Sequence, residues 1–563
     1  MFHLLGRYRF IGFFSLFLLL PQAAFISVAH ASVTSDSEIQ KQQTRQQANE
    51  QEKRQKQSQI VLPGRVVPAG GFQLPAETPC FPINTIQLEG ERLEAFSFVQ
   101  PYLNHFAGQC VGREGLNQIL KQTGNLILSR GYTTTRLTLP AQNLASGTLI
   151  LHLQPGLIED VKLLDKSGKA SKLGNWHNAF AFRRGDILNL RDLEQGLEQI
   201  KRLPSIDADL KIEPGSKAGQ SVIVVTVSPI KPWRLVATLD NSGFPSTGKI
   251  QAGLNLAIDN PTGHFDQLTL YANRDTQANN DPLGTHGNSF GYSLPWGNWL
   301  GSVTASTSQY HQTIPGTNQT FISSGESQNL QLKLQRLLHR DQSSKTTLQA
   351  SLYRQWSRSY IDGAEIMVQR RDTTAAELAI LHRQYIGQTQ IDVQLAQRQG
   401  VSWFGGQTDA QPHDPTSPTF GYTVNTLDLS LTTPLPHNMR YSGQFHGQSS
   451  SDVLYATNYM AIGNRWTVRG YSGEYTLADE DGMTLRNDLE FAHWGQSTFY
   501  LALDGGQVHG NASLPGHTLT GGGLGLRGQY GQAFYDLFIG APIAHPDTFP
   551  GGPVAYFQLG YQI

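Results

Sequence analysis

Long apolar segments are missing from this 563-residue chain once its first 31 residues are set aside. No later run approaches the ~18 consecutive apolar residues that a membrane-spanning helix requires. A spanning helix is therefore excluded after Ala31. Two classes remain: a soluble protein, or a membrane protein built as a closed β-barrel, the other arrangement that leaves no unpaired backbone groups in lipid.

A charge excess of either sign is also missing. The chain has 43 lysines and arginines against 44 aspartates and glutamates, and 41 basic residues remain if Arg7 and Arg9 are removed with residues 1–31. Phosphate binding needs a basic excess or a concentrated basic face. We therefore expect no nucleic-acid partner.

Enzyme motifs are missing as well. The sequence has no Walker loop, no H-E-x-x-H and no G-x-S-x-G. The stretch GLGLRG, Gly523 to Gly528, fits the dinucleotide pattern, but that site needs a surrounding βαβ unit and a helix amino terminus beneath the phosphate. We interpret it as a glycine-rich strand. The sequence predicts no enzyme, no cofactor and no metal site.

The amino terminus has the pattern of a cleaved export signal. Two arginines precede an apolar core, Phe10 to Leu20, and the stretch AHA ending at Ala31 supplies the small residues that a signal peptidase needs. A buried amino-terminal helix is the alternative. With residues 1–31 as a signal peptide, the mature chain begins near Ser32.

Cysteine is scarce, because the chain has only Cys80 and Cys110. An even pair in an exported chain favours a disulfide, which would stabilise its domain by about 3–4 kcal/mol by closing a loop of about 30 residues. Two unpaired thiols are the alternative. A metal site is disfavoured, since His105 is the only other Cys or His close to either cysteine.

Distinct zones follow the signal. Residues 32–62 are almost entirely polar, and residues 63–80 form a Pro/Gly-rich linker. Residues 81–156 and then 157–230 each combine period-two stretches with helical spacing. We interpret them as two tandem copies of one small α+β module.

One helix of the second module is predicted in detail from NLRDLEQGLEQIKRLPS. Asn189 is a capping candidate, with Asp192 three residues further on. Helical spacing places its apolar residues on one face. That face comprises Leu190, Leu193, Leu197 and Ile200.

Helical periodicity disappears after Trp233. Short period-two segments follow, such as TLDLSLTT, in which Leu427, Leu429 and Leu431 share one face. Alternating strands of ~10 residues are typical of a transmembrane β-barrel, and residues 231–563 allow about sixteen strands at about 21 residues for each strand and turn. A secreted array of β-sandwiches is the alternative, but the aromatic-rich terminal strand AYFQLGYQI favours the membrane.

Several stretches resemble the outer-membrane transporters of two-partner secretion in Gram-negative bacteria, the TpsB family of ShlB/FhaC/HecB type. CFPINTIQLEG and NLRDLEQGLEQIKRLPS are similar to its two periplasmic POTRA domains, and LVATLDNSGFPSTG to the start of its barrel. RWTVRGYSGE, LRNDLEF, LDGGQV and GLRGQYGQAFYDLFIGAPI resemble its carboxyl-terminal motifs. The resemblance covers essentially the whole mature chain. It implies a β-barrel of about 16 antiparallel transmembrane strands in the outer membrane, with two amino-terminal α+β POTRA domains in the periplasm.

The resemblance also implies a functional loop, around 464–486, that folds back from the extracellular side into the barrel lumen. An arginine at its tip meets an aspartate on the inner wall, and these are Arg469 and Asp504 here, with Gly506 beside the aspartate in LDGGQV. In this family an aromatic residue often stands at the position of Ala502, so the packing around the aspartate departs from the pattern. The loop motif VRGY comprises Val468, Arg469, Gly470 and Tyr471.

The residues themselves agree with this assignment. In FYLALDGG the apolar face holds Phe499, Leu501 and Leu503, which turns Asp504 towards the lumen. The glycine of VRGY permits a tight turn, and its tyrosine offers a flat ring for packing. Without the resemblance, an external loop with a solvated arginine would be favoured.

The polar zone is implied to be a plug helix through the barrel, because a helix polar all round suits a water-filled lumen. The alternative is a disordered periplasmic spacer. Residues 36–59 carry this pattern.

The implied function is secretion of an unfolded exoprotein of TpsA type: a haemolysin, an adhesin or a contact-dependent inhibition toxin. Its amino-terminal secretion domain would dock on the POTRA domains, where edge strands such as TTTRLTLP offer β-augmentation, and some family members also activate a haemolysin. The partners are this client and outer-membrane lipid, and we expect a monomer or a weak dimer. Two alternatives remain: an insertase of the same superfamily, which usually has more tandem modules, and a passive porin or adhesin, which needs none.

Overall fold

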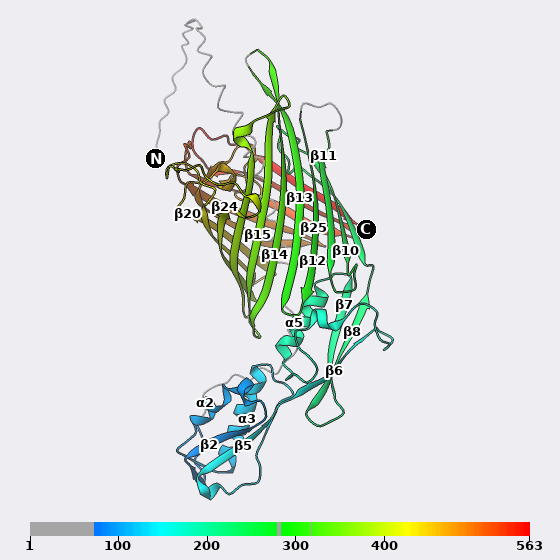
Figure 1. Ribbon diagram of the computed structural model, residues 1–563, viewed down its shortest axis with the longest axis vertical. Helices are drawn as coiled ribbons and strands as arrows, with labels where there is room; N and C mark the ends of the chain where they lie inside the picture. Colours follow the sequence, from blue (N-terminus) through cyan, green and yellow to red (C-terminus); the bar gives the residue numbers. More distant parts are fainter. Residues whose placement is uncertain (1–72, 278–282, 317) are drawn as a thin grey trace, which may run out of the picture.

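The structure is a computed structural model that describes residues 73–277, 283–316 and 318–563. Two α+β modules precede a closed β-barrel, and Figure 1 shows them in blue and cyan at one end of the barrel. The predicted signal peptide and polar plug helix lie outside the described residues. Among the described residues, no helix combines the length and the apolar character needed to cross a membrane.

The first module packs helices on one face of a three-stranded sheet. In this sheet β5 is central, parallel to β2 and antiparallel to β4. Its apolar core includes Phe96, Leu103 and Ile119, which are fully buried. The elements are β1 (Phe81–Ile83), β2 (Thr85–Gly90), η1 (Leu93–Phe96), α2 (Val99–Asn104), β3 (Gln109–Val111), α3 (Arg113–Ser129), β4 (Arg136–Thr138), η2 (Leu144–Ser146) and β5 (Thr148–Gln154).

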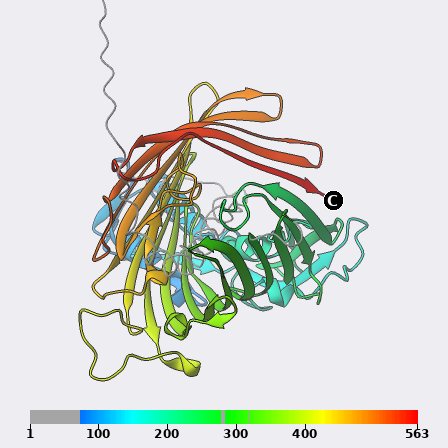
Figure 2. The same ribbon diagram turned by 90° about the horizontal axis from the view of Figure 1, so that it is seen from above.

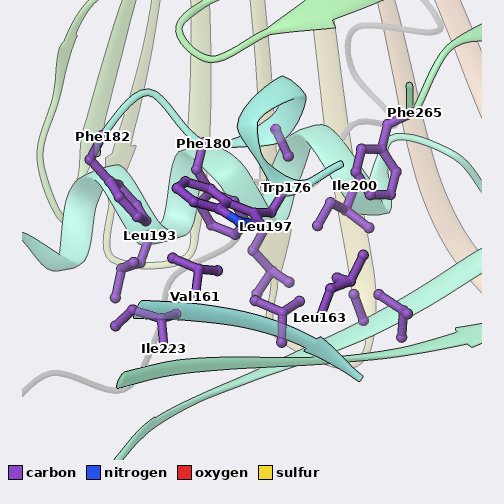
Figure 3. Close-up of a cluster of buried hydrophobic side chains, with 14 of the residues drawn as sticks. Val161, Leu163, Trp176, Phe180, Phe182, Leu193, Leu197, Ile200, Ile223 and Phe265 are labelled. Carbon is purple, nitrogen blue, oxygen red and sulfur yellow. The ribbon is translucent and has the colours of Figure 1, made fainter. Parts of the chain in front are cut away.

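The second module repeats this sheet. Strand β8 is central, parallel to β6 and antiparallel to β7. The predicted apolar face of α5 is buried, and Figure 3 shows Leu193, Leu197 and Ile200 of α5 facing Val161 and Ile223 of the sheet. Each such side chain contributes about 1.5–3 kcal/mol when it leaves water. The elements are β6 (Leu157–Leu164), α4 (Trp176–Ala179), α5 (Leu190–Lys201), β7 (Ile206–Pro214) and β8 (Gln220–Pro229).

The barrel has sixteen long antiparallel strands and closes between β27 and β9, where Tyr561 lies opposite Ala237. The predicted sixteen-stranded barrel is confirmed, and a sandwich array is excluded. Its strands are β9 (Trp233–Asp240), β10 (Gln251–Asp259), β11 (Gln267–Asp275), β12 (Leu283–Trp296), β13 (Trp299–Pro315), β14 (Thr320–Arg340), β15 (Ser344–Ile361), β17 (Arg371–Ile386), β18 (Thr389–Val401), β19 (Thr423–Leu435), β20 (Met439–Ser450), β23 (Asp481–Trp494), β24 (Ser497–His509), β25 (Thr518–Tyr530), β26 (Ala533–Ala544) and β27 (Val554–Gln562). Shorter elements lie between them: β16 (Ala364–Glu365), η3 (Met367–Gln369), η4 (Trp403–Gly405), η5 (Ala456–Asn458), β21 (Met460–Ile462) and β22 (Leu477–Asp479).

Side chains alternate between the two faces of the barrel wall. On β24, Leu501 and Leu503 are 44% and 52% exposed, whereas Ala502 and Asp504 between them are 2% and 1% exposed. The exposed face is apolar and faces lipid, and the other faces the barrel interior, which Figure 2 shows from above. Trp296, the last residue of β12 beside the second module, is 74% exposed, as expected for an aromatic at a membrane interface.

Candidate functional site

The segment between β20 and β23 lies against the inner wall of the barrel. Its motif residues Val468, Arg469 and Tyr471 are 0%, 5% and 2% exposed. The groups that contact Arg469 and Tyr471 come from β23 to β27, which are strands of the wall. An apolar cluster fastens the segment further, comprising Met460, Ile462, Val468, Tyr471, Leu477, Val508, Leu519 and Phe549.

Two carboxylates hold the Arg469 guanidinium. Its Nε and Nη2 donate to the two oxygens of Asp504 at 2.7 and 2.8 Å, and its Nη1 lies 2.7 Å from Oδ1 of Asp488. The backbone N–H of Arg469 also donates to Asp504 (3.0 Å), and Nη2 donates to the carbonyl of Asn487 (3.2 Å). Removing one partner from such a buried, bidentate pair costs about 3–5 kcal/mol, because the other charge is left uncompensated.

The inner wall carries further charges that the sequence reasoning did not single out. Arg527 lies 3.1 Å from Asp488 and 3.0 Å from Glu490, and Nη1 of Arg486 donates to the carbonyl of Trp466 in the loop (3.0 Å). Period two in LRNDLEF places the charged residues at 486, 488 and 490 on one face opposite leucines. This alternation is the sequence signal that could have identified these charged residues as facing the lumen.

The two residues after the arginine fix the path of the loop. Gly470 has φ +103°, and a Cβ there would lie 2.5 Å from a carbonyl oxygen of β26, so only glycine fits. The Tyr471 hydroxyl lies 2.9 Å from the carbonyl oxygens of both Thr520 and Ala544. The Tyr471 carbonyl in turn accepts from the hydroxyl of Tyr556 (2.5 Å). The tip is thereby bound to three neighbouring strands.

Gly506 allows the loop to approach β24 closely. A Cβ at this position would lie 2.8 Å from Cγ2 of Val468, which is closer than side chains normally pack. At Gly505, whose side faces away from the lumen, a Cβ would meet nothing within 4 Å. The second glycine of LDGGQV is therefore the one that the loop requires.

Ala502, where the resemblance led us to expect an aromatic residue, packs with rings from other residues. Tyr500, Phe538 and Tyr556 stack in series, with ring centroids 6.2 and 5.4 Å apart. The guanidinium of Arg469 lies 5.6 Å from the centroid of Phe538, within the range of a cation–π contact.

Helix α5 of the second module closes against the turns at one end of the barrel. Arg340, at the end of β14, is 2.7 Å from Glu198 and 3.5 Å from Glu194, and Lys345 of β15 also pairs with Glu198. Arg202 donates to the hydroxyl of Ser293 (2.8 Å). Module and barrel are therefore joined by buried ion pairs.

Burial and nearby cations shift the pKa values of two acids of this helix in opposite directions. Burial, with a smaller contribution from Asp186, raises the pKa of Asp192 to about 6. Burial also acts to raise the pKa of Glu198, but Lys345 and Arg340 together hold it below its ordinary value. The predicted cap at the start of α5 is present, because the Asn189 side chain accepts a hydrogen bond from the backbone N–H of Arg191 (2.8 Å).

Cys80 and Cys110 form a disulfide that joins the start of β1 to β3 in the first module. In the described part of the chain, no group of three or more His, Cys, Asp or Glu side chains could hold a metal ion.

A sixteen-stranded barrel with two α+β modules and a loop bound inside its lumen defines a class of outer-membrane protein transporter. Family models agree: the haemolysin secretion/activation protein ShlB/FhaC/HecB model matches residues 219–528, a ShlB-type POTRA model matches 81–156, and another POTRA model matches 157–214. The chain belongs to the ShlB/FhaC/HecB family.

Curated relatives are transporters of the outer membrane. The chain is 38% identical over 516 residues to outer membrane transporter CdiB-2 of Burkholderia pseudomallei, covering 87% of each chain. It is 29% identical to CdiB of Dickeya dadantii (95% of this chain, 96% of the relative) and 28% identical to hemolysin transporter protein ShlB of Serratia marcescens (74% and 73%).

Solved structures show the same architecture. CdiB from Escherichia coli superposes with a TM-score of 0.85 at 25% identity, and CdiB from Acinetobacter baumannii with 0.84 at 27% identity. Each alignment covers 96% of this chain and all of the other. The protein is thus an outer-membrane transporter of two-partner secretion, with its POTRA modules on the periplasmic side, as the sequence predicted.

Proposed function

We propose that the protein secretes a contact-dependent inhibition exoprotein through its barrel, and that the pairing of Arg469 with Asp504 and Asp488 holds the inward loop in place between transport events. The buried guanidinium with its two carboxylates carries the proposal, because it is the charged contact that couples the loop to the wall. The names of the relatives support the client class, since CdiB proteins combine the higher identities with the wider coverage.

Client capture is proposed at the edges of the two module sheets. Strand β4 pairs only with β5, and β7 only with β8, among the described residues. The nine-residue β7 offers a longer free edge than the three-residue β4. An extended client segment can add to such an edge through backbone hydrogen bonds.

The division of the chain is part of the same proposal. Residues 81–156 and 157–230 act as receptor modules and residues 231–563 as the conduit, in a protein that works as a monomer or a weak dimer. The buried contacts of α5 with the barrel turns support a fixed receptor position, so that a captured segment is presented at the periplasmic opening.

The test is export by an Arg469→Ala variant. Barrel insertion, read by heat-modifiable gel mobility, should be retained, while the exoprotein outside the cell falls sharply. Arg440→Ala is the matched control, because Arg440 pairs with Glu490 at 2.7 Å but its side chain is 55% exposed. Normal export by Arg469→Ala contradicts the role of the pair, and equal loss in both variants assigns the defect to general damage.

A further inference from the structure

A short aromatic segment lies on the outside of the barrel, just beyond the end of β18. We call η4, Trp403 to Gly405, the aromatic finger. The hydroxyl of Thr374 donates to the Trp403 carbonyl (2.8 Å), and Nη2 of Arg354 donates to the Gly405 carbonyl (3.2 Å). Thr374 and Arg354 are opposite each other on β17 and β15.

Strand alternation shows that both donors face outward. Thr374 is in phase with Leu378 and Ile380, which are 56% and 49% exposed, and out of phase with Glu377, which is 9% exposed. Because Arg354 is paired directly with Thr374, it shares that face. The finger therefore folds down over the outer wall of the barrel.

The wall holds the finger in an unfavourable backbone conformation. Phe404 has φ +55°, a left-handed conformation that is unfavourable for a bulky residue and persists only where the surrounding structure imposes it. The result is that the rings of Trp403 and Phe404 are displayed outward, 55% and 76% exposed. The Arg354 guanidinium lies 4.7 Å from the centroid of a third ring, Trp356.

The height of the finger matches the edge of the membrane. Thr374 is four residues beyond Leu378, which is about 13 Å along a strand and roughly 10 Å along the membrane normal at a barrel tilt of 35–45°. Beyond it lies a charged group in which Arg358 contacts Glu365 and Asp372 at 3.8 and 3.9 Å. Apolar, aromatic and charged layers follow one another in the order found across a lipid–water interface.

We propose that Trp403 and Phe404 are a lipid anchor seated in the interfacial region of the outer leaflet. Continuity with the lipid-facing rows of β15 and β17 selects lipid as the occupant. At the far end of the chain between β18 and β19, the ring of Phe420 stacks on that of Tyr455, with the two centroids 4.5 Å apart. Figure 2 shows this yellow-green segment outside the ring of strands.

The experiment measures the depth of single nitroxide labels on the full-length transporter in phosphatidylcholine vesicles without client. The two native cysteines are joined in a disulfide, so Phe404→Cys supplies one reactive thiol. Leu378→Cys on the lipid face is the lipid reference, and Ala410→Cys, exposed further along the same segment, is the water reference. Accessibility to oxygen and to a water-soluble nickel chelate is recorded for each label.

The Phe404 label should be more accessible to oxygen than to the chelate, at a depth between the two references. Accessibility equal to that of the Ala410 label overturns the proposal, because the finger would then stand in water. Dipolar broadening between labels at low protein density also overturns it, since a second copy would be the occupant. Retention of β-barrel gel mobility in each variant shows that the depths refer to folded protein.

Discussion

A methyl group added at Gly506 should loosen the inward loop, whereas the same change one residue earlier should not. At Gly506 the new Cβ would lie 2.8 Å from Cγ2 of Val468, 3.1 Å from Cγ2 of Thr484 and 3.2 Å from Cγ2 of Ile462. All three neighbours are β-branched and restricted at χ1, so they yield less readily than a flexible side chain would. We therefore expect the loop to move away from the wall.

The expected size follows from this overlap. Overpacking by one methyl group in a filled interior costs about 1–3 kcal/mol. If the loop relieves that strain by leaving the wall, its released population rises by about 5- to 150-fold, because 1.4 kcal/mol is a factor of ten. Gly505→Ala should change nothing, since its Cβ would meet no atom within 4 Å.

Trypsin cleavage after Arg465 or Arg469 reports the released loop, because both arginines are protected only while the loop lies against the wall. Gly506→Ala should be cut faster than the unmodified transporter in reconstituted vesicles, and Gly505→Ala at the unmodified rate. Equal cleavage of the two variants would refute the reasoning. Faster cleavage of Gly505→Ala alone would mean that the loop contacts the opposite face of β24 and not the lumen face.

The remaining predictions concern the periplasmic modules. The raised pKa of Asp192, about 6, means that the folded protein favours the neutral form of this carboxyl. The free energy of unfolding should therefore fall as pH rises from about 4 through 6. Asp192→Asn should raise the melting temperature at pH 7.5 but not at pH 4. If the melting temperatures of the variant and of the unmodified protein changed equally with pH, this prediction would be wrong. Arg340→Ala removes a cation that Glu194 and Glu198 share, although Arg191 and Lys345 still pair with them, so the cost should be at most about 3–5 kcal/mol. Amide exchange in α5 should therefore rise, while Lys201→Ala, from an exposed pair on the same helix, should leave it unchanged. Cys80→Ser should lower stability by about 3–4 kcal/mol under oxidising conditions, and an unchanged unfolding midpoint would argue against a stabilising disulfide.

Local periodicity explains which parts of the fold could be predicted from sequence. Alternation in stretches such as TLDLSLTT, and the single apolar face of α5, depend on residues a few positions apart, so sequence alone indicates a barrel and two modules. Strand ends are less well determined: TTTRLTLP gives only the three-residue strand Arg136–Thr138.

Contacts between distant residues lie beyond such reasoning. Arg340 and Glu198 are 142 residues apart, and they meet because barrel closure places the turn after β14 beneath α5. Asp488 was missed for a related reason, since its alternation identifies the lumen face without showing which loop residue reaches it. The resemblance named Asp504, and only the three-dimensional register adds the second carboxylate.

The inward loop combines firm attachment with a feasible release. Replacing Arg469 with alanine leaves Asp488 and Asp504 without their shared cation at a buried site with little water, and this uncompensated charge destabilises the variant. Movement of the whole loop is different, because it returns the guanidinium and both carboxylates to water, where a paired and an unpaired state differ by only about 0–1 kcal/mol. The remaining resistance comes from the apolar cluster around Val468 and from the hydroxyl contacts of Tyr471. We therefore expect a client that replaces these contacts with its own to displace the loop.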